Sequence, residues 1–171
     1  MDHLNTNKLL PLGDSSGGSR MTNSHGGVCY DIPVGEKPLR RFTQLFSNGE
    51  IWGVERPTEH AESLKYIAFA VLTKSLCGGL EGYLAFMRDQ LGIAPPLQII
   101  AGLSGIAGYR VADRRFSVVS MSDFSGGCPK DEVVSAPIVI DTYDVSAEDV
   151  LAPFFQKVWE EFELSGSWKV E

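Results

Sequence analysis

A serine set between glycines is the first pattern in this chain that suggests covalent chemistry. Gly102-Leu-Ser-Gly-Ile106 approaches the Gly-x-Ser-x-Gly nucleophile elbow of hydrolases, but isoleucine stands where the motif needs its last glycine. In that motif family the histidine that takes the serine proton follows the serine along the chain. The last histidine here is His60. The sequence therefore predicts no hydrolase, and we expect no catalytic residues and no enzyme.

Two further glycine patterns resemble phosphate-binding loops without meeting their requirements. Gly102, Gly105 and Gly108 recur every third residue, whereas the dinucleotide fingerprint needs Gly-x-Gly-x-x-Gly between a strand and a helix. The loop Ser125-Gly-Gly-Cys-Pro-Lys130 lacks the Gly-Lys-Ser/Thr ending of a P-loop. We interpret these glycines as turns, bulges or close backbone approaches, and we expect no cofactor.

Side chains of metal-binding type are present but scattered. None has the close spacing of zinc ligands: His3, His25, Cys29, His60 and Cys128. The three cysteines, the third being Cys77, are odd in number and far apart, which argues against a disulfide framework and is typical of a reducing compartment. We expect no metal and a cytoplasmic location.

Charge is distributed unevenly along the chain. Residues 131–171 hold ten acids and two bases, while the remainder is nearly neutral and the whole chain has a net charge of −7. Such an acidic domain repels phosphate backbones, so nucleic acid is an unlikely partner. No apolar run approaches the roughly 18 residues of a membrane span, so we expect no membrane partner. The basic cluster is Arg110, Arg114 and Arg115, which we interpret as a solvated strand end.

The elements that position these residues begin with a hairpin. Apolar residues alternate in 40–46 and recur in 50–55, and Asn48-Gly49 between them predicts a tight type I′ turn. Residues 13–27 hold five glycines and four serines, a composition that buries too little apolar surface to offset the entropy of ordering. We therefore expect a flexible leader over 1–27 and a single domain over 28–171.

Helical periodicity follows over residues 59–92, interrupted by Gly78-Gly79, where we expect two helices or a sharp kink. Gly92 is expected to cap the C-terminal end of this helical stretch. Strands are then expected in 97–104, with 106–111 as its continuation or as a separate strand after a bulge, and in 115–121 and 133–140, with Pro137 indicating an edge or a bulge. A last helix follows a capping box at Ser146, and Pro153 favours a helix start near Ala152. The order predicts an α+β fold: an antiparallel five-stranded meander covered by helices, in a profilin- or roadblock-like arrangement.

One helical stretch suggests a contact surface. Residues 66–72, YIAFAVL, are apolar on every face of the expected helix, whereas a helix lying on a sheet should keep one polar stripe. Either another part of the chain or a partner must cover it. We expect Phe69, in the middle of this stretch, to contact a protein partner or a second copy of the chain in a homodimer.

Three segments of the sequence resemble a known family. These are QLFSNGEIWGVE, GIAPPLQIIAGLSGIAGYRVADRRF and PIVIDTYDVSAEDVLAPFFQKVWEEF. Over roughly residues 28–164 the chain resembles the C-terminal accessory region of bacterial Schlafen-like (AlbA-type) proteins, which are described as DNA-binding or ATP-binding. The resemblance implies that the chemistry of such proteins belongs to an upstream domain, so it transfers no nucleic-acid activity to any residue here.

These observations favour a non-enzymatic interaction or accessory domain that acts through protein contacts. The alternative is a small-molecule- or nucleotide-binding sensor module, with Tyr109, Arg110 and Arg115 lining its pocket. No residue pattern in the sequence decides between the two.

The arginine cluster generates a first prediction. Three phosphate contacts would give a salt slope of only about −2.7, so we expect no saturable DNA or RNA binding tighter than about 10⁻⁴ M at about 150 mM salt in a polarisation assay. Micromolar binding that disappears in an Arg110→Ala, Arg114→Ala, Arg115→Ala variant would contradict this expectation.

Overall fold

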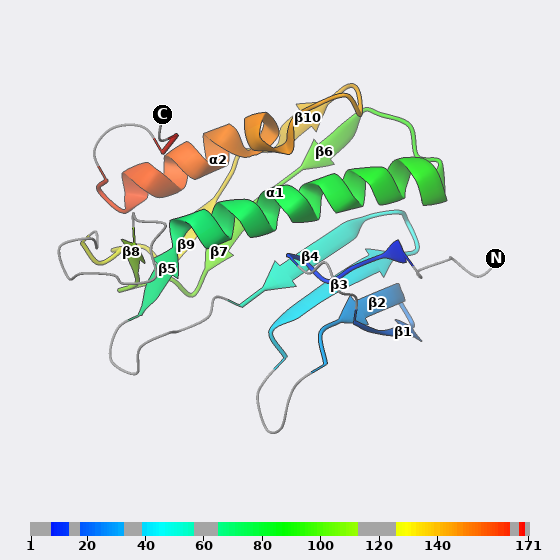
Figure 1. Cartoon of the computed structure of the whole chain (residues 1–171), viewed down its shortest axis with the longest axis horizontal. Coiled ribbons are helices and arrows are strands. Elements are labelled where there is room, and N and C mark those ends of the chain that lie inside the picture. Colours follow the sequence, from blue (N-terminus) through cyan, green and yellow to red (C-terminus); the bar gives the residue numbers. More distant parts are fainter. Residues whose placement is uncertain are drawn as a thin grey trace. The chain divides into compact units, whose positions relative to one another are not determined.

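The computed structural model describes residues 8–13, 18–32, 39–56, 65–112, 126–164 and 168–169 (Figure 1). Two α-helices, α1 (Phe69–Phe86) and α2 (Ala147–Glu161), combine with short strands that are mostly antiparallel, which confirms the expected α+β class. The chain divides into two compact units. Unit 1 comprises Met1–Pro57 and Lys74–Ala94, and unit 2 comprises Thr58–Thr73 and Pro95–Glu171.

Unit 1 is built on a four-stranded antiparallel sheet. Its strands follow one another in chain order: β1 (Ser19–Asn23), β2 (Gly26–Tyr30), β3 (Arg41–Phe46) and β4 (Ile51–Glu55). Figure 1 shows this meander in blue to cyan, with the C-terminal half of α1 running along one side of it. Each strand pairs with the next one in the chain, so the sheet has β1 and β4 as its edges.

The segment 1–27, expected as a flexible leader, contains regular secondary structure in the part that is described. Residues 19–30 form the β1–β2 hairpin, and the His25 N–H donates to the Asn23 side chain at 2.9 Å to close the turn. Leu9 and Leu12 are buried. The glycine- and serine-rich segment would not form a strand by itself, and pairing of β2 with β3 stabilises it. The expected single domain over 28–171 stays a prediction.

The predicted hairpin over 40–46 and 50–55 is confirmed by β3 and β4, but its turn differs from the type expected. Only Gly49 has a positive φ, of 88°, whereas a type I′ turn needs positive φ at two successive residues. The Phe46 N–H donates to the Glu50 carbonyl at 2.8 Å, which leaves three residues in the loop. A type I turn with a glycine bulge therefore connects the strands, and Gly49 supplies its left-handed residue.

The C-terminal half of α1 covers one side of this sheet, the inner face. Leu9, Cys29, Leu45 and Phe86 form the buried cluster between them, and Ile51, Tyr83 and Leu91 pack around it. The Glu55 carboxylate bonds both the Ser75 hydroxyl on α1 and Arg41 Nε on β3, the latter at 2.7 Å. These contacts hold the helix along the sheet.

Helix α1 is continuous through Gly78-Gly79, so the expected kink or break there is wrong (Figure 1). A Cβ at Gly79 would collide with Leu12 Cδ1, whereas a Cβ at Gly78 would meet no atom within 4 Å. Gly79 therefore allows Leu12 to approach the helix closely and does not terminate it. A π-helical turn (Met87–Leu91) follows α1 and ends at Gly92, which has φ 62° and caps the helix as the sequence predicts.

Unit 2 holds three two-stranded ladders. β6 (Leu97–Ile99) pairs with β10 (Ile138–Ile140), and β7 (Gly102–Ser104) pairs with β9 (Glu132–Val134), both antiparallel. The third ladder is parallel and joins β5 (Tyr66–Ala68) to β8 (Arg110–Ala112). The five-stranded meander of the sequence analysis is not confirmed among the described residues.

A β-bulge separates the β6–β10 and β7–β9 ladders. Two residues, 100–101, lie opposite three, 135–137. The Ser135 N–H donates to the Ala101 carbonyl at 2.8 Å, and the Ser135 hydroxyl accepts the Ala101 N–H at 3.0 Å. The Ser135 hydroxyl takes the place of a backbone carbonyl where the ladder is irregular. Pro137 has no backbone N–H, so the bulge leaves no donor of this residue without a partner. The sequence-based expectation of a bulge at this proline is confirmed.

Helix α2 begins at Ala147, earlier than the start near Ala152 that Pro153 favoured. The Ser146 side chain caps the helix by accepting the Asp149 N–H at 3.4 Å. Pro153 lies inside the helix, with both Pro153 and Asp149 exposed to solvent. Water can therefore bond the Asp149 carbonyl that Pro153 leaves without an N–H partner, so the cap determines the helix start.

The glycine pair of α1 provides a matched test of this packing. Gly78→Ala should raise the free energy of unfolding by up to about 1 kcal/mol, because alanine favours a helix and the site is open. Gly79→Ala gains the same helix propensity but must displace buried Leu12, so it should be less stable than Gly78→Ala by about 1–3 kcal/mol. Urea denaturation measures both, and equal stabilisation by the two alanines would contradict this account.

Tyr83 binds the inner face of the sheet through its hydroxyl. Thr43 Oγ1 donates to the Leu10 carbonyl at 2.8 Å, so Tyr83 donates to Thr43 Oγ1, at 2.6 Å. Burial raises the pKa of Tyr83 to about 12, against the lowering effect of the Thr43 hydroxyl and with a smaller raising effect of Cys29. The neutral phenol is therefore the form that the folded chain stabilises.

This raised pKa predicts an alkaline loss of stability. Above pH about 10 an unfolded tyrosine loses its proton, whereas Tyr83 in the folded chain keeps it. The contribution of Tyr83 to the free energy of unfolding is therefore complete below pH 10 and is lost as pH rises towards about 12. Chemical denaturation between pH 8 and pH 12, at about one-unit steps, should show a steeper fall for the natural chain than for Tyr83→Phe. Parallel pH profiles would contradict the proposed burial of the phenol.

Candidate interaction face

The β1–β4 sheet has a second side, the outer face, opposite the one that α1 covers. Successive side chains of a strand point to opposite sides. Thr43 and Gly53 lie on the inner face, since Thr43 bonds Tyr83 and a Cβ at Gly53 would meet the Tyr83 ring. The alternate residues therefore lie on the outer face, and its apolar members are Met21, Val28, Tyr30, Phe42, Phe46, Trp52 and Val54.

Several of these apolar side chains are open to solvent. Trp52 is 57% exposed, Met21 54% and Val54 42%. Val28, Tyr30, Phe42 and Phe46 are half-buried by their neighbours in the sheet. Isolated exposed apolar residues are ordinary, but a contiguous set on one sheet face is typical of an interaction site.

The amide of Gln44, in the middle of the outer face, is already hydrogen-bonded within the chain. Gln44 Nε2 donates to the Gly27 carbonyl at 3.1 Å and to the Leu45 carbonyl at 2.9 Å, and Gln44 Oε1 accepts from Asn23 Nδ2 at 2.8 Å. Gln44 is 8% exposed. Covering this face would not leave the Gln44 amide without partners, which removes a large part of the usual cost of desolvating a polar group.

Trp52 is held in place although it is exposed. Its indole N–H donates to Glu50 Oε1 at 2.7 Å, and its ring meets Phe46 edge-on with the centroids 5.6 Å apart. His25 packs against the other side of this group, 6.4 Å from Phe46. A fixed ring loses little conformational entropy on binding, which favours Trp52 as an anchor residue.

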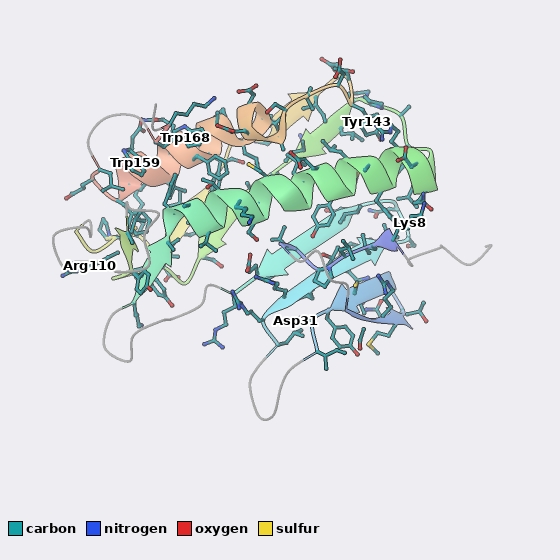
Figure 2. All side chains as sticks on the ribbon, in the orientation of Figure 1. Lys8, Asp31, Arg110, Tyr143, Trp159 and Trp168 are labelled. Carbon is teal, nitrogen blue, oxygen red and sulfur yellow. The ribbon has the colours of Figure 1, made fainter. Side chains whose placement is uncertain are left out.

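The strand residues of the outer face carry no charge, and Glu50, which lies beside Phe46 at the β3–β4 turn, places one carboxylate at its margin. All its strand residues are described, and none of them carries a charged side chain. The sequence of unit 1 as a whole has eight acids and eight bases, so the entire net charge of −7 belongs to unit 2. Arginine is confined to the ends of the sheet or to its inner side: the Asp31 carboxylate, labelled in Figure 2, accepts the Arg40 and Arg41 N–H groups at 3.2 and 3.0 Å.

Phe69, which the sequence analysis selected for partner contact, is buried in unit 2. It is 5% exposed and packs edge-on against Trp159 at 5.0 Å, with Phe155 and Trp168 beside it. Figure 2 labels both tryptophans. The stretch 66–72 is not helical throughout, because 66–68 form β5 and the helix begins at Phe69. The chain itself therefore covers Phe69, and we drop Phe69 from the proposed contact.

Tyr109 and Arg110 lie together in unit 2, both half-buried, at the start of β8. Lys65 Nζ lies 5.7 Å from the centre of the Tyr109 ring, and the Arg110 N–H donates to the Lys65 carbonyl at 3.0 Å. Arg115, Arg114 and the strand expected over 115–121 lie outside the described residues. The expected pocket can therefore be followed only as far as Arg110, which Figure 2 labels.

All three cysteines are thiols, with Cys29 and Cys128 buried and Cys77 half-buried. Cys128 is only 2% exposed although it lies in the loop before Pro129. The described part of the chain contains no group of three His, Cys, Asp or Glu side chains placed to hold a metal ion. No helix in the described ranges is both long enough and apolar enough to cross a membrane.

Comparisons with protein-family models, with curated proteins and with the solved structures find no match to this chain. The resemblance to the accessory region of Schlafen-like proteins therefore stays a hypothesis that rests on the three sequence segments alone.

The outer face was missed in the sequence, although the hairpin carries its signal. A strand with one solvent-exposed face should alternate apolar and polar residues. In β3, Phe42 and Phe46 share one side while Leu45 lies on the other, and in β4 Trp52 and Val54 lie opposite Ile51. Apolar residues on both sides of two paired strands indicate a sheet covered on both faces.

Proposed function

We propose that this chain is a non-enzymatic interaction domain that binds protein through the outer face of the β1–β4 sheet. The observation that carries the proposal is a contiguous and partly exposed apolar face whose strand residues are uncharged and whose central amide is hydrogen-bonded within the chain. Helix α1 stabilises the opposite side, so the outer face is free to bind without loss of the core. This role requires no catalytic residue and no cofactor, and we place it in the cytoplasm on the basis of the cysteine pattern.

The family proposal fits the same role. An accessory region of a Schlafen-like (AlbA-type) protein would contribute contacts while an upstream domain contributes chemistry. We also retain as a proposal the finer description of the fold, a five-stranded meander in a profilin- or roadblock-like arrangement. Such folds present one sheet face to helices, as the inner face of unit 1 does.

The alternative, a small-molecule- or nucleotide-binding sensor, has narrower support. It draws on a single cluster in which Lys65 lies over the Tyr109 ring beside Arg110. A cation over an aromatic ring, with a second basic residue next in the chain, suits an anionic ring compound. The expected third cation, Arg115, lies outside the described residues.

The interaction role predicts a selective effect of one exposed side chain. Trp52→Gln removes the anchor from the outer face, and loss of a tryptophan of this kind typically costs about 2 kcal/mol or more, a fall in affinity of more than tenfold. Affinity capture from cells, with quantitative mass spectrometry, should show proteins that the natural chain retains and Trp52→Gln loses.

Val139→Gln is the matched control, since Val139 is 58% exposed but belongs to unit 2. It should retain the same proteins as the natural chain. Far-UV circular dichroism checks that both variants are folded. If Trp52→Gln and the natural chain capture identical sets, the outer face is not the binding surface.

A further inference from the structure

We propose that the outer face binds the outer face of a second copy of this chain, about a two-fold axis that runs parallel to the strands. The inference rests on the proposed function and names its partner. It is carried by the way the residues of this face are ordered from β1 to β4.

Strand register places the outer-face residues in rows that run across the sheet. One row is Met21, Val28, Gln44 and Trp52, in the order β1 to β4. The next row is Ser19, Tyr30, Phe42 and Val54.

A third row lies beside the two hairpin turns. It contains Asn23, Gly26 and Phe46, with Glu50 joined to Phe46 by a backbone hydrogen bond of 2.8 Å. Each row therefore crosses the sheet at one level along the strands.

A two-fold axis parallel to the strands reverses the order across the sheet and keeps each row at its own level. β1 then faces β4 of the second copy, and β2 faces β3. Met21 lies opposite Trp52, a thioether against an aromatic ring. Gly26 lies opposite Phe46, so a ring faces a position without a side chain.

Three of the four remaining opposed pairs are complementary in size or chemistry, and the fourth sets Val28 against Gln44, whose amide is bonded within its own chain. Ser19 faces Val54, small against medium, and Tyr30 faces Phe42, which forms an aromatic pair. Asn23 faces Glu50, an amide opposite a carboxylate. Large side chains thus meet small or planar ones, the condition for close packing between two sheets.

The other in-plane axis, perpendicular to the strands, gives a poorer fit. Each strand would then face itself, so Trp52 would oppose Trp52 along one edge and Met21 would oppose Met21 along the other. Bulk would be concentrated on one side of the interface. The order of the rows therefore favours the axis that is parallel to the strands.

Electrostatics permit a second copy as the occupant. Two molecules of net charge −7 repel each other, but the charge lies in unit 2, and the outer face has no charged strand residue. A strongly charged partner would gain nothing from this surface. A single-stranded nucleic acid would use its aromatic rings but would also need a basic groove beside them.

The size of the face predicts weak association. Four strands about 4.8 Å apart and five residues of about 3.4 Å each give a sheet plane of roughly 300 Å². Stable interfaces of standard size bury about 800 Å² on each partner. We therefore expect a reversible dimer that forms in the range of tens to hundreds of micromolar.

Sedimentation equilibrium of the purified chain from about 10 µM to about 1 mM tests this dimer over the range expected for a small interface. The mass should rise towards that of a dimer, and Trp52→Gln should weaken association by at least tenfold. Val139→Gln should leave it unchanged. A chain that stays monomeric throughout, or a dimer that Trp52→Gln does not affect, overturns the proposal.

Cysteine cross-linking tests the axis. Ser19→Cys mixed with Val54→Cys should be joined by a short bismaleimide, because these positions face each other across two sheets about 10 Å apart, a gap that a direct disulfide cannot span. Either variant alone should give no more cross-link than the natural chain, which controls for Cys29, Cys77 and Cys128. Cross-linking of a single variant with itself, or none in the mixture, overturns this geometry.

Two outcomes separate this inference from the proposed function. A monomer that captures a different protein through Trp52 overturns self-association and leaves the outer face as a protein-binding site. A monomer whose Trp52 fluorescence is quenched by single-stranded oligonucleotides, with no protein captured, overturns both.

Discussion

The packing of α1 against the inner face of the β1–β4 sheet is the constraint on which the rest of unit 1 depends. Tyr83 reaches across to Thr43, Glu55 bonds Ser75, and Phe86 enters the cluster with Cys29 and Leu45. A two-stranded hairpin is marginal in water, and the four-stranded sheet gains its stability from a covered face. Because one helix covers one face, the described part of the chain leaves the other face to solvent or to a partner.

This constraint also explains why the composition of residues 13–27 did not predict the strands β1 and β2. Composition describes what a segment can bury by itself, and residues 13–27 can bury little. The ladder with β3 changes the balance, because hydrogen bonds and the side chains of a neighbouring strand are supplied from residues 41–46. Leu9 and Leu12 add apolar anchors on the helix side, and the absence of a side chain at Gly79 makes room for Leu12. A single-sequence reading lacks these distant contributions.

Turns, helix caps and bulges were predicted well, because a few neighbouring residues determine each of them. The Asn48-Gly49 hairpin, the Ser146 cap, the Gly92 cap and the bulge at Pro137 all depend on backbone requirements of a few residues. The candidate site was predicted poorly, because it depends on which side of a sheet a helix covers. Phe69 illustrates the difference: its apolar surroundings were visible in the sequence, but the aromatic side chains of Trp159 and Phe155 that bury it come from residues far along the chain.

The treatment of polar groups distinguishes the outer face from a merely exposed surface. Gln44 stands in the middle of apolar neighbours, yet its two N–H bonds and its carbonyl are used within the chain, and Trp52 gives its one N–H to Glu50. A face that always met water would have no need for such internal pairing, since water would bond each group. Internal pairing lowers the cost of removing that water, so the arrangement favours a surface that is covered for part of the time. The inner face obeys the same rule, because the Thr43 hydroxyl that α1 buries donates to the Leu10 carbonyl and accepts from Tyr83 of the helix.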